Sequence, residues 1–170
     1  NIFVLLTGFS FFMLDDALTK GPTWYKDYGL EGMQYGSQQV FTRAAEIARE
    51  QPETTVLVSS TWANGSDVLQ RFFAGDLPNL RMGNINAFAL EYRPLDQNTL
   101  FVMTQEDVDF IDESDKFTDV TVEEILPYPD GSPGFYFIRL AYVDNIEAIL
   151  DAEQEARQTL LREELTIDGQ

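Results

Sequence analysis

An apolar run of strand length near the middle of the chain organises the elements that the sequence predicts around it. The run Thr54–Ser60 is rich in β-branched residues, follows Pro52 and ends in two serines, a composition typical of a strand. Its apolar residues are consecutive rather than alternating, so both faces of the strand need cover. We therefore expect Val56, Leu57 and Val58 to be almost fully buried in a central parallel strand.

A turn and a short helix are expected directly after this strand. Residues 61–65 have the composition of a turn, and apolar side chains recur at helical spacing over residues 66–73. Ser66 or Asp67 is the expected N-cap, because either side chain can accept a hydrogen bond from an N–H group of the first turn. Ligands of open α/β sheets bind at the carboxyl ends of such strands. The turn is therefore a candidate site.

Helical patterns recur elsewhere in the chain. Residues 37–50 carry apolar side chains on one helical face, with Ser37 as the expected N-cap, and residues 144–159 show a similar pattern. Thr104, followed three residues later by Asp107, predicts a helix that opens with a capping box in which Asp replaces the usual Glu or Gln. These helices alternate with the strands along the chain.

Further strands are expected within residues 80–90, at 100–103, and at both 117–126 and 135–142. The last two flank residues 127–134, a segment of prolines and glycines, so they should form an antiparallel hairpin. Strands that alternate with helices and end in one hairpin predict an α/β fold. We expect a three-layer sandwich with a mostly parallel sheet and an antiparallel edge hairpin.

The two ends of the chain differ in composition from this domain. Residues 2–14 are almost wholly apolar but too few to cross a bilayer, which needs about 20 residues. They are consistent with a core helix or with the severed end of a transmembrane helix. We expect a fragment of a longer protein that divides into an apolar helix at 1–16, an aromatic and glycine-rich loop at 17–36, an α/β domain at 37–160 and a truncated tail at 161–170.

Charge and missing residue types exclude several classes of function. The formal net charge of −18, from 11 basic and 29 acidic residues, repels nucleic acid and anionic lipid. The chain has neither cysteine nor histidine, which removes Cys and His nucleophiles, the Ser-His-Asp triad and the usual zinc ligands. Acidic residues crowd residues 106–115 without the spacing of an EF-hand. We expect no metal, no cofactor and no nucleic-acid partner.

The candidate binding site combines the central turn with the aromatic loop before residues 37–50. A right-handed crossover would start that helix beside the carboxyl end of the central strand, and so bring the loop to the turn. The candidate binding residues are Trp24, Tyr28, Tyr35, Trp62, Asn64 and Asp67. An alternative stays open, in which Asn64 and Gly65 only form a tight turn and Trp62 only fills the core.

Several motifs together resemble one family of proteins. They are DYGLEGMQYG at 27–36, STWANG at 60–65 with Phe72 and Phe73, LPYPDG at 126–131, GFY at 134–136 and YVDN at 142–145. With them the chain resembles the extracytoplasmic C-terminal region of bacterial membrane glycosyltransferases similar to the dolichyl-phosphate-mannose protein mannosyltransferases. The resemblance spans nearly the whole chain, and its motifs are family-specific patterns rather than chemical signatures.

The resemblance implies a parent enzyme that transfers a sugar from a polyprenyl-phosphate donor to an acceptor outside the cytoplasm. Residues 2–14 would end its last membrane span. The catalytic acid of such enzymes lies in an early extracytoplasmic loop that this chain does not contain. We therefore expect a non-catalytic domain on the extracytoplasmic side of the cell membrane that helps to bind a glycan or an acceptor protein.

Two alternatives belong to other classes of function. One is a structural or protein-interaction module without a ligand. The other is a hydrolase that uses Asp67, Glu91 or Asp144, since paired carboxylates can perform acid–base catalysis without histidine.

Overall fold

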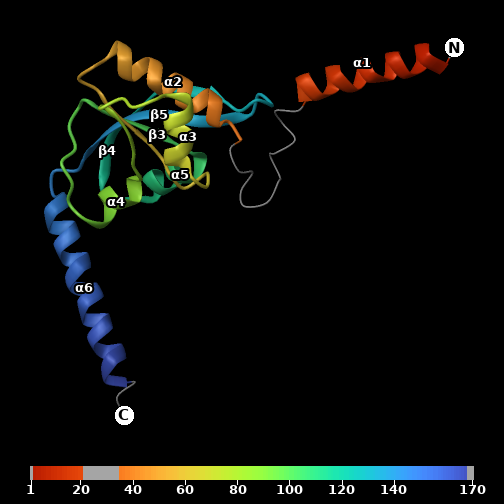
Figure 1. The fold of residues 1–170 in the computed structure, drawn as a ribbon. Coiled ribbons are helices and arrows are strands. Elements are labelled where there is room, and N and C mark those ends of the chain that lie inside the picture. Colours follow the sequence, from red (N-terminus) through yellow and green to blue (C-terminus); the bar gives the residue numbers. More distant parts are fainter. Residues whose placement is uncertain (1, 21–34, 168–170) are drawn as a thin grey trace.

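The computed structural model describes residues 2–20 and 35–167 (Figure 1). Helices and strands alternate over most of this length, as the sequence predicts. In chain order the elements are α1 (Ile2–Lys20), α2 (Ser37–Glu50), β1 (Thr55–Val58), α3 (Ser66–Phe73), β2 (Leu80–Met82), α4 (Ile85–Leu90), β3 (Thr99–Met103), α5 (Gln105–Glu113), β4 (Phe117–Pro127), β5 (Pro133–Tyr142) and α6 (Ile146–Ile167).

The strands of the described residues form one five-stranded mixed sheet with the order β2-β1-β3-β5-β4. β1 pairs in parallel with both β2 and β3, whereas β5 is antiparallel to β3 and to β4. The predicted α/β fold is confirmed, with a parallel centre and an antiparallel hairpin at one edge.

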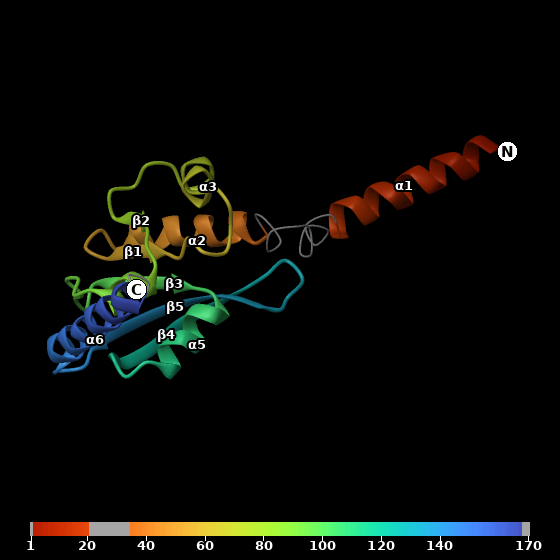
Figure 2. The same ribbon diagram turned by 90° about the horizontal axis from the view of Figure 1, so that it is seen from below.

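Helices cover both faces of the sheet, which gives three layers (Figure 2). On one face, α2 and α3 bury a cluster that includes Phe41, Val58 and Phe135. On the other face, α4 and α5 bury a second cluster around Phe101 and Ile138. A sheet with parallel central strands is covered by helices on both faces, so two cores form, one on each side of the sheet.

The central strand β1 is interior and parallel, but its burial is uneven. Val56 and Val58 are fully buried, whereas Leu57 is half-buried, so the expectation for Leu57 is wrong. Leu57 points to the face opposite α2, where it packs at the border of the second core and meets Gly83. The cover on that face does not extend over the whole strand.

The starts of α2 and α3 differ from the prediction. Each helix is preceded by a glycine in the left-handed region, Gly36 with φ 77° and Gly65 with φ 65°, and neither helix has a side-chain cap. Ser37 and Ser66 are instead the first helical residues, and both are buried. Glycine reaches this backbone conformation without strain. It therefore turns the chain sharply into each helix where a serine cap was expected.

The predicted capping box of α5 is present. Asp107 Oδ2 accepts hydrogen bonds from the Thr104 backbone N–H at 3.1 Å and from the Thr104 hydroxyl at 3.2 Å. Both residues are buried. This cap holds the first turn of α5 directly against the end of β3.

Two elements depart in extent from the sequence pattern. Residues 80–90 contain the expected strand β2 but also the short helix α4, whose first turn is capped by Asn84 accepting from the Asn86 N–H at 2.8 Å. α6 begins at Ile146 and continues to Ile167, beyond the predicted end at residue 159. Its first turns bury Ile146 on the domain, and the helix then leaves it (Figure 1).

Helix α1 does not contribute to either core. Phe3, Phe9 and Phe12 are 81%, 66% and 64% exposed, and the helix lies apart from the sheet and its covering helices (Figure 1). Poor packing is what we expect of a severed membrane span. Among the described residues, however, no helix combines the length and the apolar character that crossing a bilayer requires.

Candidate functional site

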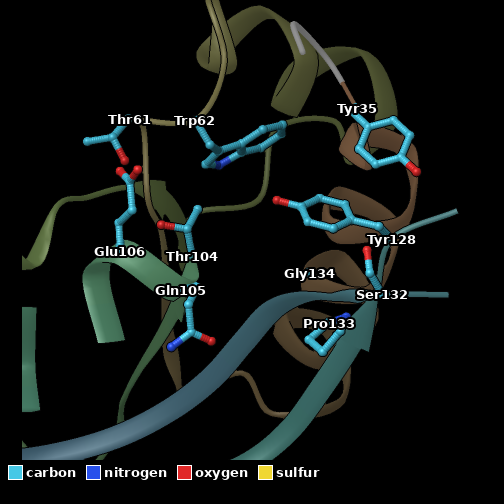
Figure 3. A pocket seen from close by; sticks show the side chains of 10 residues that line it. All are labelled: Tyr35, Thr61, Trp62, Thr104, Gln105, Glu106, Tyr128, Ser132, Pro133 and Gly134. Carbon is cyan, nitrogen blue, oxygen red and sulfur yellow. The ribbon is translucent and has the colours of Figure 1, made fainter. Parts of the chain in front are cut away.

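A pocket of about 340 Å³ opens at the carboxyl ends of the parallel strands β1 and β3 (Figure 3). The turn of the β4–β5 hairpin forms its other side. The lining residues are Tyr35, Thr61, Trp62, Thr104, Gln105, Glu106, Tyr128, Ser132, Pro133 and Gly134. This is the edge of the sheet at which α/β proteins bind ligands.

Trp62 contributes an edge of its ring to the pocket, while the rest of the ring belongs to the core. The side chain is 8% exposed and packs against Phe41 and Phe135, with ring centroids 5.9 Å and 4.9 Å away. Its indole Nε1 is buried and has no hydrogen-bond partner within the part of the chain that the structure describes. An unsatisfied buried donor costs about 1–3 kcal/mol. An acceptor supplied by a ligand would recover that cost.

Tyr35 and Tyr128 form the opposite wall. Their ring centroids lie 5.0 Å apart with planes inclined by 30°, and Tyr128 also packs edge-on against Phe135 at 5.3 Å. Gly36 permits this approach, because a Cβ at that position would lie 2.9 Å from both the Tyr128 and the Phe135 ring. The residue before α2 is thereby held against the hairpin.

Gly134 allows the hairpin to close beneath Tyr128. A Cβ at Gly134 would lie 2.8 Å from the Leu126 carbonyl oxygen and 3.0 Å from the Tyr128 nitrogen. Both contacts are with backbone atoms, which cannot move aside as a side chain can. Glycine is therefore needed here for close backbone packing rather than for an unusual φ.

The start of α5 provides the polar side of the pocket. The Thr104 hydroxyl donates its proton to Asp107. Gln105 is held by two further contacts, since its Nε2 donates to Asp109 Oδ1 at 2.7 Å and its Oε1 accepts from the Tyr136 hydroxyl. Glu106 is exposed in the first turn of α5. The orientation of these amide and hydroxyl groups is thus set by their neighbours.

The pocket wall carries no positive side chain among the described residues, and Glu106 is its one charged member there. With a chain charge of −18, such a site disfavours phosphate, sulfate and carboxylate ligands. Aromatic rings with a few oriented polar groups suit a neutral ligand that has both apolar and polar faces.

The structure brings together part of the predicted site. Tyr35 and Trp62 line the same pocket, as the crossover argument predicts. Asn64 and Asp67 lie outside its lining. Trp24 and Tyr28 fall outside the described residues. Of the candidate binding residues within the described chain, Tyr35 and Trp62 lie at the pocket.

Asn64 and Asp67 serve the turn and the helix that follows it. Gly65 next to Asn64 has the positive φ of a tight turn. Asp67 forms an exposed ion pair with Arg71 one helical turn later, at 2.8 Å. These positions agree with the structural interpretation of the turn.

The three candidate carboxylates of the hydrolase alternative do not converge. Asp67 lies on α3, Asp144 is exposed before α6, and Glu91 lines a separate pocket of about 290 Å³ where it pairs with Arg93. Within residues 2–20 and 35–167, no group of acidic side chains is arranged to hold a metal ion. The geometry therefore gives no acid–base pair among these three.

Sequence reasoning missed several lining residues. Tyr128 was assigned only to a turn, and Thr104 only to a helix cap. Their one available signal is position: Tyr128 lies between two prolines in the turn of the hairpin, and Thr104 follows a parallel strand immediately. The strand order of the sheet decides which strand ends lie next to the hairpin turn. Local sequence patterns do not determine that order.

Comparison with models of protein families, with curated proteins and with solved structures finds no match to this chain.

Proposed function

We propose that this domain binds a neutral carbohydrate in the pocket between Trp62, Tyr35 and Tyr128. The observation that carries the proposal is the wall of this pocket, in which aromatic side chains face oriented polar groups and no cation is present among the described residues. Sugar rings have apolar C–H faces and polar edges, so they match such a wall. The domain acts as a binding module and not as the catalyst.

The parent protein is, in this proposal, a membrane glycosyltransferase that uses a polyprenyl-phosphate sugar donor. The resemblance of the sequence motifs to the mannosyltransferase-like enzymes supports it. The exposed apolar side chains of α1 also support it, because Phe3 and Phe9 would be covered by lipid or by the parent's other helices. The domain would then hold a glycan or a glycosylated acceptor outside the cytoplasm, close to the membrane.

A titration with neutral glycosides tests the binding. Amide and indole signals of the ¹⁵N-labelled chain should move for residues around Trp62, Tyr35 and Tyr128, and those of the pocket at Glu91 should not. Tyr128→Ala should weaken binding about 3- to 10-fold, since an aromatic contact contributes about 0.5–1.5 kcal/mol.

Tyr92→Ala is the matched control for this variant. Tyr92 is 55% exposed, stacks on Tyr142 at 5.7 Å and lines the other pocket. It should lose some packing but no affinity. Equal effects of the two substitutions, or no glycoside-dependent signal, would contradict the proposal. Sugar transfer by the chain alone from a polyprenyl-phosphate donor would contradict the non-catalytic role.

A protein-interaction role is the second candidate, and one exposed surface favours it. Val68 and Phe72 lie one turn apart on α3 and are 58% and 79% exposed. Exposed apolar pairs of this kind occur at protein contacts. Replacing both by serine should leave glycoside binding unchanged. If it instead abolishes the function of the parent enzyme while the pocket variants do not, the interaction role is the correct one.

A further inference from the structure

Among the described residues of the pocket, Trp62 carries a hydrogen-bond donor that the fold itself does not use. Trp62 Nε1 is buried without an acceptor among the described residues, and an indole N–H can only donate. Figure 3 shows the nitrogen on the edge of the ring that faces Thr104 and the hydroxyl end of Tyr128. The wall of this pocket therefore holds an unpaired donor, which a ligand can reach only when neighbouring side chains move.

Thr104 provides the matching acceptor. Its hydroxyl proton is directed at Asp107 Oδ2, 3.2 Å away, and that same oxygen also accepts from the Thr104 backbone N–H. An ionised carboxylate can only accept, so the threonine proton stays committed to it. In the capping box Thr104 Oγ also accepts from the Asp107 backbone N–H, so one lone pair of this oxygen remains for a ligand. The Thr104 side chain lies directly below the indole ring (Figure 3).

A donor and an acceptor of fixed polarity select among the polar groups of a sugar. A hydroxyl group presents its proton and its lone pairs on one atom, and a carboxylate has no proton to give. A secondary amide has an acceptor oxygen and a donor N–H on separate atoms. In an acetamido group this amide ends in a methyl, which suits the neighbouring rings of Tyr128 and Pro133.

We propose that the pocket binds the acetamido group of an N-acetylated sugar. The carbonyl oxygen accepts from Trp62 Nε1, the amide N–H donates to Thr104 Oγ, and the methyl group packs against Tyr128. Trp62 Nε1 is covered in this structure, so the proposed contact requires side chains of the pocket to move when the ligand binds. This assignment rests on the proposed carbohydrate binding and specifies its substrate class.

The test compares the methyl glycoside of N-acetylglucosamine with methyl glucoside, which differs at the acetamido position. The chain has 2 tryptophans, so a ¹H–¹⁵N spectrum of the whole chain contains two indole signals. Trp62→Phe identifies the Trp62 signal by its loss. The acetamido sugar should move that signal strongly downfield, as a new hydrogen bond does, whereas methyl glucoside should move it only by the smaller shift expected of any glycoside in contact with the ring.

Trp62→Phe keeps an aromatic ring in the core and removes only the donor with part of the ring. It should weaken binding of the acetamido sugar about 5- to 10-fold, and it should weaken binding of methyl glucoside, which loses only ring contact, by a smaller factor. The Thr104 pair repeats the test without touching the core: Thr104→Val should weaken acetamido binding by a similar factor, and Thr104→Ser should restore it. If Trp62→Phe unfolds the chain, the Thr104 pair decides.

The outcomes separate this inference from the proposed function. Equal binding of both glycosides, with no effect of Trp62→Phe or Thr104→Val, overturns the acetamido assignment and leaves a sugar site. Absence of binding by either glycoside overturns both proposals. Selective binding that Thr104→Ser retains and Thr104→Val loses supports the inference.

Discussion

Lys116 is a buried polar residue whose replacement should affect the fold, because its side chain joins three elements. It lies immediately before β4, is 9% exposed, and its Nζ donates to the Ala89 carbonyl oxygen at 2.9 Å and to a Glu153 carboxylate oxygen at 2.8 Å. Ala89 belongs to α4 and Glu153 to α6. Lys116→Met keeps the aliphatic stem and removes both hydrogen bonds.

The expected loss follows from what each partner does afterwards. The Ala89 carbonyl oxygen is buried at this contact, and an unpaired buried acceptor costs about 1–3 kcal/mol. The Glu153 side chain is 43% exposed and regains water, so its lost ion pair contributes only about 0–1 kcal/mol. Lys116→Met should therefore lower the free energy of unfolding by about 1–3 kcal/mol.

Urea unfolding followed by circular dichroism measures this loss. Glu153→Gln should cost less than Lys116→Met, because it leaves the hydrogen bond to Ala89 in place. Arg71→Met is the control, since it breaks an exposed ion pair whose partners are 61% and 63% exposed, and it should change stability by less than about 0.5 kcal/mol. A Lys116→Met variant as stable as the Arg71→Met variant would refute the reasoning.

Three further changes have defined outcomes. Trp62→Ala should lower the free energy of unfolding by about 3–5 kcal/mol, because most of the ring is buried in the core. Urea unfolding measures this loss. A free energy of unfolding within about 1 kcal/mol of wild type, on the order of a surface change, would show that the ring serves mainly to contact a ligand. Gly36→Ala should cost about 1–2 kcal/mol for its positive φ alone, and its clash with Tyr128 should also perturb the pocket signals in a ¹⁵N spectrum; unchanged signals would contradict this. Burial raises the pKa of the Tyr142 hydroxyl, so the folded state favours the protonated hydroxyl. The stability contributed by this hydroxyl is therefore fully present below the ordinary pKa of about 10 and is lost as the pH rises through the raised pKa. Tyr142→Phe should lose about 1 kcal/mol at neutral pH with its hydrogen bond to Phe88 and should flatten the alkaline decline of stability, whereas a decline as steep as that of wild type would contradict the assignment.

Several parts of the molecule follow from the sequence because their causes are local. The apolar runs at β1 and β3, the Pro and Gly residues of the β4–β5 turn and the capping box at Thr104 each act within a few residues, and each element forms where the sequence predicts it. The meeting of Tyr35 with Trp62 also follows, because α2 leads through a short turn into β1 and packs on it, which places the start of α2 near the carboxyl end of β1.

The helix starts were mispredicted for a local reason of another kind. Ser37 and Ser66 have the residue type of a cap, but each follows a glycine that takes up the left-handed conformation. The sequence offers both a serine that could cap the helix with its side chain and a glycine that could turn the chain into it. Local composition does not say which of the two forms. At α2, the close approach of Gly36 to Tyr128 and Phe135 favours the glycine start. This contact exists only in the folded chain.

The pocket depends on the tertiary structure for its remaining walls. Hydrophobic periodicity indicates which side chains are buried and leaves open what they are buried against. Tyr128 faces Trp62 because β5 lies between β3 and β4 in the sheet. This strand order brings the turn of the β4–β5 hairpin to the carboxyl ends of the parallel strands. The sequence by itself therefore determined most of the elements, the α/β class and one aromatic wall. Strand order decided which hairpin residues form the opposite wall, because pairing between distant segments is a property of the whole packed sheet.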